Sequence, residues 1–145
     1  MLDRPLLLHR FVDDETRSFG ILLRDASPLV RQQALLLLSQ LLLEDYYKWK
    51  PPLLRAFCVC LVDKEPTLRA AAHGCLFDLL LPRSPLVGFN AILPLLFALN
   101  GCVHAPHHPT ALPPAERALV EMSGDGEQRR RLSILRALLA PLGDE

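Results

Sequence analysis

Apolar residues dominate the chain in long stretches that are separated by short polar or proline-containing breaks. The stretches are rich in leucine and alanine and lack the strict alternation of a half-buried strand, so the pattern predicts helices. The expected helices are 16–24, 28–43, 52–62, 66–81, 85–99, 115–122 and 127–139. Between the expected helices 85–99 and 115–122, residues 100–114 are rich in glycine, histidine and proline, and we expect them to form an exposed loop.

Residues 35–43 are apolar on almost every side of the predicted helix. Only Ser39 and Gln40 interrupt this run of leucines. A helix that is hydrophobic all round must be covered on more than one side. We therefore expect 28–43 to be an inner helix of a stacked array.

One short pattern occurs twice, at a spacing of 38 residues. An aspartate, a proline, an arginine and an alanine return in the same order; the two sets are Asp25, Pro28, Arg31 and Ala34, then Asp63, Pro66, Arg69 and Ala72. A repeat with a period in the high thirties is typical of helix pairs that stack into a solenoid. The sequence therefore predicts at least two such pairs.

Each residue type of the repeated pattern has a physical role at its position. An aspartate side chain can accept backbone N–H groups at the turn between two helices, and a proline suits the first helical turn. An alanine lets the paired helix approach closely because its side chain is small. The arginines are expected to point away from that contact, where each can reach an aspartate of its own turn or of the adjacent repeat.

Composition and charge exclude several classes of protein. Of 145 residues, half are hydrophobic and only 6% are aromatic, which excludes a disordered chain and disfavours a β-rich fold. The 16 basic and 16 acidic residues balance, so bulk positive charge does not indicate a nucleic-acid-binding domain. The most apolar run is about half the length of a bilayer span, so we expect no membrane segment. Four cysteines without a disulfide-type framework indicate a reducing compartment.

The repeated pattern and the segment that follows its first copy carry a family resemblance. Asp-x-x-Pro-x-[Val/Leu]-Arg-x-x-Ala is characteristic of HEAT repeats, and Leu-x-Glu-Asp-Tyr-x-Lys-Trp-Lys at 42–50 resembles the D-type, non-SMC HEAT-repeat subunits of condensin II. The similarity covers most of the chain from Phe19 onward, whereas 100–114 departs from the family pattern. Because full-length members are much larger, the resemblance predicts a fragment.

The resemblance implies an all-α HEAT-repeat α-solenoid segment with two repeats and flanking helices. We expect an N-terminal segment at 1–15, the HEAT-repeat region at 16–99, the Pro/His-rich loop at 100–114 and C-terminal helices at 115–145. The implied function is a non-catalytic scaffold of a condensin II-like complex, which supports mitotic chromosome condensation and chromosome organisation in the nucleus. The implied partners are the kleisin and other condensin II subunits, with DNA or chromatin as a further contact.

A different class of function stays open beside that implied by the resemblance. HEAT and armadillo-type repeats also form generic peptide-binding adaptors that are unrelated to chromosomes. Residues 44–50 favour the condensin interpretation, because a generic adaptor has no reason to share this segment.

Two basic clusters are candidate contact sites for DNA or a partner. Lys48 and Lys50 lie among aromatic residues at 46–50; alternatively, the aromatic rings fill the core and the lysines are only solvated. Arg129, Arg130 and Arg131 form the densest positive charge and are candidates for contact with DNA or an acidic segment. The alternative is an ordinary solvated helix face. Ser133, which follows two of these arginines, fits a basophilic kinase site weakly.

Other chemistry finds little support in the sequence. Cys102, His104, His107 and His108 are zinc-ligand types, but their spacing matches no known finger, so we expect neither a metal nor a cofactor. The chain contains no glycine-rich phosphate loop and no G-x-S-x-G nucleophile turn. We therefore expect no enzyme activity and no small-molecule substrate.

Overall fold

The computed structural model describes residues 18–101 and 122–143, and all regular structure in these ranges is helical. Residues 18–22 are helical and are followed by α2 (Pro28–Leu43), α3 (Pro51–Cys60), α4 (Pro66–His73), η1 (Gly74–Leu80), η2 (Leu81–Arg83), α5 (Pro85–Leu99), η3 (Asp125–Glu127), α7 (Gln128–Leu139) and η4 (Ala140–Leu142). The predicted all-α fold class is confirmed.

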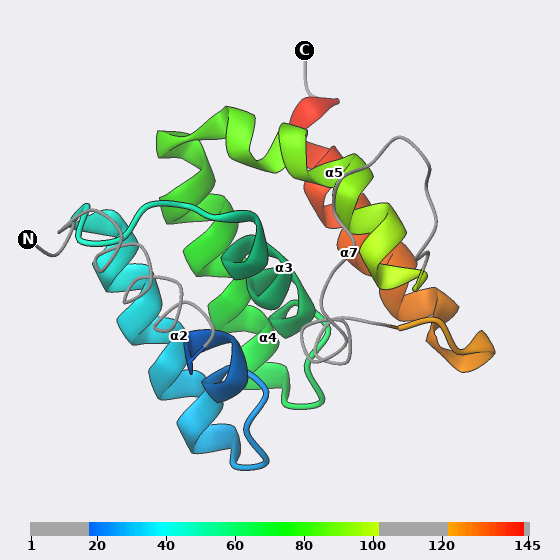
Figure 1. The fold of residues 1–145 in the computed structure, drawn as a ribbon, viewed down its shortest axis with the longest axis horizontal. Helices are drawn as coiled ribbons and strands as arrows, with labels where there is room; N and C mark the ends of the chain where they lie inside the picture. The colour runs from blue at the N-terminus through cyan, green and yellow to red at the C-terminus, as the bar shows by residue number, and fades with distance from the viewer. Residues whose placement is uncertain (1–17, 102–121, 144–145) are drawn as a thin grey trace, which may run out of the picture.

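The helices stack in pairs from one end of the molecule to the other (Figure 1). Helix 18–22, α3 and α5 lie on the viewer's side, and α2, α4 and α7 lie behind them. The second helices of the first two pairs pack against each other, since α2 contacts α4 and η1. Helix α3 contacts α4 and α5, and α5 contacts α7. This order is that of an α-solenoid.

Prolines set where four of the helices begin. Pro28, Pro51, Pro66 and Pro85 occupy the first turns of α2, α3, α4 and α5, where the missing N–H would have no intrahelical partner. Helix α2 ends where Asp45 adopts a left-handed conformation with φ of 60°. This bend brings the next two N–H groups, those at 46 and 47, to the carbonyl of Leu41, at 3.0 and 3.2 Å.

The predicted helix 66–81 changes its winding partway along. It is α-helical only to His73, continues as a π-helix over Gly74–Leu80 and closes with a 3-10 turn that ends at Arg83. Gly74 weakens the α-helix at the first change, and Pro82 has no N–H to donate at the second. The prediction is therefore correct in extent but wrong in helix type. Residues 115–121 lie outside the described ranges, and Met122 itself is not helical.

The hydrophobic core runs between the two layers. Its largest fully buried side chains include Phe57 of α3, Leu35 of α2, Leu76 of η1 and Leu99 of α5. The expectation that α2 is an inner helix is wrong, because Leu36 and Leu37 are 48% and 50% exposed. Helix α2 stands at the edge of the described stack, where no described helix covers its outer side.

Within the described ranges, no single helix has the length and hydropathy needed to cross a membrane. Pro66–Arg83 and Pro85–Leu99 are long and apolar enough only when they are taken together, and the two segments meet at a bend of 118°.

Candidate binding surfaces and the inter-repeat clamp

The two repeated aspartates close their turns in the same way. Asp25 Oδ1 accepts the N–H of Ser27 at 2.9 Å, and Asp63 Oδ1 accepts the N–H of Glu65 at 3.0 Å. Each carboxylate therefore binds the backbone N–H of the residue directly before the proline that begins the following helix. The repeated pattern therefore encodes a repeated turn.

Arg31 joins the first repeat to the second. Its Nη1 donates to the carbonyl oxygens of Asp25 and Ala26, at 2.7 and 3.3 Å, which fixes the side chain over its own turn. Its Nη2 donates to Asp63 Oδ1 at 3.0 Å, and Nε lies 2.9 Å from Oδ2 without hydrogen-bond geometry. We call the contact between Arg31 and Asp63 the inter-repeat clamp. The two side chains are 13% and 8% exposed, so solvent screens this ion pair little.

Arg69 repeats only half of this arrangement. Its Nη1 donates to the carbonyl oxygens of Asp63 and Lys64, at 2.7 and 3.2 Å, as Arg31 does one repeat earlier. The side chain is exposed and meets no carboxylate among the described residues. The clamp therefore holds the first two helix pairs together but has no counterpart at Arg69.

A third copy of the pattern, missed in the sequence, begins the last described helix. This copy is partial: Asp125 and Arg131 are six residues apart, as are Asp25 and Arg31, but Gln128 takes the place of the proline and Ile134 that of the alanine. Arg131 Nη1 donates to the carbonyl of Gly124 at 3.0 Å and also to that of Met122, so it too holds its own turn. Helix α7 is thus the second helix of a third pair. The spacing concealed this copy, because Arg69 and Arg131 are 62 residues apart instead of 38.

The predicted arginine cluster separates into different environments. Arg130 Nη1 forms an ion pair with Glu127 at 2.7 Å, and its Nη2 donates to the carbonyl of Val62 at 3.2 Å. Arg131 binds its own turn, as described above. The Arg129 side chain is exposed and makes no ion pair within the described residues. The structure thus brings two of the three arginines into intramolecular contacts and leaves Arg129 at the surface.

The aromatic and basic side chains at 46–50 also lie in different environments, some packed against the core and others exposed. Tyr47 meets Phe19 edge-on with ring centroids 5.8 Å apart, and Trp49 meets Phe57 at 6.0 Å. Both rings pack against the core, whereas Tyr46 is 75% exposed. Lys48 is exposed, and Lys50 is half-buried and interacts within the chain. Contact of either lysine with a partner stays a prediction.

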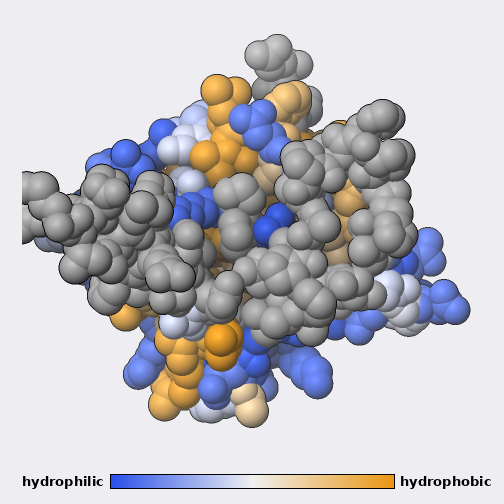
Figure 2. Space-filling view, viewed as in Figure 1, coloured by the Kyte–Doolittle hydropathy of each residue, from blue (hydrophilic) through white to orange (hydrophobic). Residues whose placement is uncertain are grey.

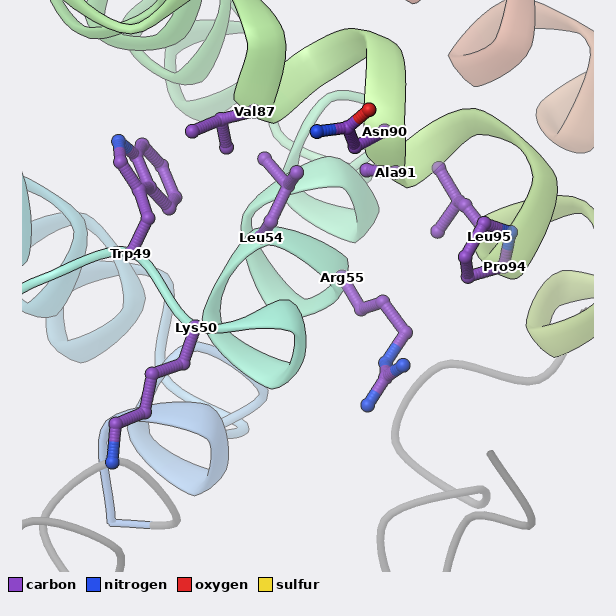
Figure 3. Close-up of a pocket in the computed structure, with 9 residues that line it drawn as sticks. All are labelled: Trp49, Lys50, Leu54, Arg55, Val87, Asn90, Ala91, Pro94 and Leu95. Atoms are coloured by element: carbon purple, nitrogen blue, oxygen red, sulfur yellow. The ribbon is translucent and has the colours of Figure 1, made fainter. Parts of the chain in front are cut away.

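An apolar groove opens between α3 and α5 (Figure 3). Its volume is about 200 Å³. The apolar lining consists of Trp49, Leu54, Val87, Ala91, Pro94 and Leu95. Lys50, Arg55 and Asn90 contribute its polar groups, and Lys50 and Arg55 already make interactions within the chain. Sequence reasoning missed this groove because its two walls lie about forty residues apart in the chain and meet only through stacking.

Cys58 and Cys60 are buried thiols of low reactivity. Burial raises the pKa of the Cys58 thiol to about 12, and the neighbouring Cys60 adds to this effect. Burial likewise raises the pKa of Cys60 to about 12, with Asp63 as the next cause. Because the thiolate is the reactive and metal-binding form, these thiols are poor nucleophiles and poor ligands at neutral pH.

The remaining predicted sites are placed as follows. Cys102, His104, His107 and His108 lie outside the described residues, and the described residues contain no group of metal-ligand side chains. Ser133 is exposed, and its Oγ donates to the carbonyl of Arg129 at 2.9 Å. Its modification stays a prediction.

Comparisons with known proteins agree on one family. Residues 6–105 match the family model of non-SMC mitotic condensation complex subunit 1. The chain is 31% identical over 135 residues to condensin-2 complex subunit D3 of Mus musculus and 32% identical over 136 residues to condensin-2 complex subunit D3-L of Xenopus laevis, which covers 92% of this chain and 9% of each relative. It is 36% identical over 86 residues to condensin-2 complex subunit CAP-D3 of Arabidopsis thaliana, with 59% of this chain and 6% of that protein covered. No solved structure matches.

Proposed function

Because the chain belongs to the family of non-SMC mitotic condensation complex subunit 1, we propose that it is a non-catalytic HEAT-repeat scaffold segment of a condensin II-type complex. In this role it supports mitotic chromosome condensation in the nucleus, on the chromosome. The chain spans less than a tenth of the length of the relatives it matches, so it supplies one part of such a scaffold. The inter-repeat clamp supports this role, since it fixes how two helix pairs stack and therefore where their surfaces lie.

We propose that the groove between α3 and α5 binds a segment of the kleisin subunit. The observation that carries this proposal is its apolar lining, with Trp49 at one end and Pro94 at the other, which suits an apolar side chain of an extended or helical segment. The exposed Asn90 carboxamide lies over the groove and can both donate to and accept from a peptide backbone. Apolar contact would thus supply affinity and Asn90 would supply orientation.

A pull-down from mitotic extract tests the function and the groove together. The unmodified chain as bait is expected to recover condensin II subunits, identified by mass. Ala91→Arg fills the groove and should abolish this recovery, whereas Ala70→Arg makes the same change at an exposed position of α4 and should not.

The outcomes of this experiment separate the alternatives. Recovery of unrelated proteins without condensin subunits would favour a generic peptide-binding adaptor. Recovery of condensin subunits by both variants would contradict the groove and leave the scaffold role standing.

Exposed cations give the scaffold a proposed secondary contact with DNA. Arg129 and Lys48 are the candidates, because Arg130 and Arg131 hold their own chain. Each phosphate contact releases counterions, so affinity should fall steeply with salt. Arg129→Glu should reduce the slope of log affinity against log salt by about one, as measured by fluorescence anisotropy with duplex DNA. Salt-independent binding would contradict a DNA contact through these residues.

A further inference from the structure

The outer face of α2 is left uncovered by the other described helices. Leu37 is the counterpart of Cys75 one repeat later, by the spacing of 38 residues. Cys75 is 9% exposed because η1 packs against α2, whereas Leu37 is 50% exposed. Leu29 and Leu36 lie on the same helix and are 62% and 48% exposed. This face is therefore shaped to receive the second helix of another pair.

The opposite end of the stack has an apolar face as well. Leu139 stands eight residues after Arg131, as Ser39 stands eight after Arg31. Ser39 is 3% exposed within the stack, but Leu139 is 49% exposed. The adjacent α5 also carries exposed, helically spaced apolar side chains; they are Leu86, Phe89, Leu93 and Leu96. Figure 2 shows hydrophobic surface over helix 18–22 and α2 and, separately, over the start of α5.

The two ends are complementary in charge. Asp25 caps its turn as Asp63 does, but no cation among the described residues reaches it. Arg131 also holds the preceding turn through Nη1, but through the carbonyls of Met122 and Gly124, which lie earlier than those that Arg31 binds, and no carboxylate among the described residues reaches it. One end thus lacks the arginine of an inter-repeat clamp, and the other lacks its aspartate. The clamp inside the molecule shows the geometry that would join them.

We propose that this face of α2 binds the α7 face of a second copy of the chain, head to tail. Arg131 of one copy pairs with Asp25 of the other, and Leu139 packs against Leu36 and Leu37. The chain has a net charge of zero, so overall charge repulsion does not oppose this contact. A head-to-tail contact leaves one face of each copy open, so association continues beyond a dimer. It requires no other subunit, and its outcome is independent of the proposed function.

Sedimentation velocity with variants of one face at a time tests this proposal. The unmodified chain should sediment as species that grow with concentration. Leu37→Glu removes one face and Leu139→Glu the other, so each variant alone should be monomeric. An equimolar mixture should form dimers and nothing larger, because each variant retains one intact, complementary face. Circular dichroism of each variant verifies that the helices remain.

A second variant isolates the ion pair. Asp25→Asn keeps an oxygen that can accept the N–H of Ser27 but removes the charge, and should weaken self-association about tenfold. A monomeric unmodified chain at all concentrations would overturn the proposal. So would a mixture of the two glutamate variants that stays monomeric, or a glutamate variant that associates as the unmodified chain does.

Discussion

Arg31 and Arg69 occupy the same position in two repeats, yet they contribute unequally to stability. Arg31 shares a buried ion pair with Asp63, and its removal leaves that carboxylate buried and unpaired. Arg31→Ala should lower the free energy of unfolding by about 3 kcal/mol. Arg69→Ala removes only hydrogen bonds at an exposed side chain and should cost about 1 kcal/mol or less. Urea unfolding of the two variants measures the difference, and equal losses would contradict the role of the clamp.

The buried thiols make stability depend on alkaline pH. The pKa of Cys58 is about 12 in the folded chain against 9.0 for an ordinary thiol, so the folded state retains a proton that the unfolded state releases. Its stabilisation is complete below pH 9 and is lost as the pH rises toward 12, at about 1.4 kcal/mol per pH unit. Urea midpoints between pH 8 and 11 should fall less steeply for Cys58→Ala than for the unmodified chain. Parallel curves would contradict this source of the pH dependence.

At the scale of the element, the two glycines Gly74 and Gly88 respond differently to a methyl group. A Cβ at Gly74 would meet only the Asp78 carboxylate, at an ordinary 3.8 Å, and the backbone there is right-handed helical. Gly74→Ala should therefore raise the melting temperature by about 2–4 °C, because it lowers the entropy of the unfolded chain. Gly88→Ala is the matched control, because its Cβ would lie 3.3 Å from a Leu81 methyl. Calorimetry should show no gain there, and equal gains would contradict this packing.

Local sequence chemistry predicted where the helices begin, but it did not predict the change from α-helix to π-helix. Prolines at 28, 66 and 85 set helix starts at the predicted residues because their effect lies within one turn. The change to a π-helix at Gly74 depends on how the segment packs against α2, which no local pattern contains. The same holds for the groove, whose walls Trp49 and Val87 meet only in the stacked array.

At the scale of the whole molecule, the first two helix pairs are joined more firmly than the last two. The inter-repeat clamp connects α2 to the turn before α4, whereas Arg69 and Asp125, its counterparts at the next junction, form no ion pair in the described structure. Amides of α7 should therefore exchange hydrogen faster than those of the central turns of α2. Mass spectrometry of peptides from 128–139 and 35–42 measures this, and equal protection would contradict a looser third pair.

The sequence by itself determined the helical class, the period of 38 residues and the family, because propensity, turn chemistry and repetition are properties of residues near one another in the chain. Only the tertiary structure decided which arginine of the repeated pattern finds an aspartate, which of the three consecutive arginines remains at the surface and which leucines of α2 stay uncovered. Those outcomes depend on what lies across a helix contact, and residues far apart in the chain supply it.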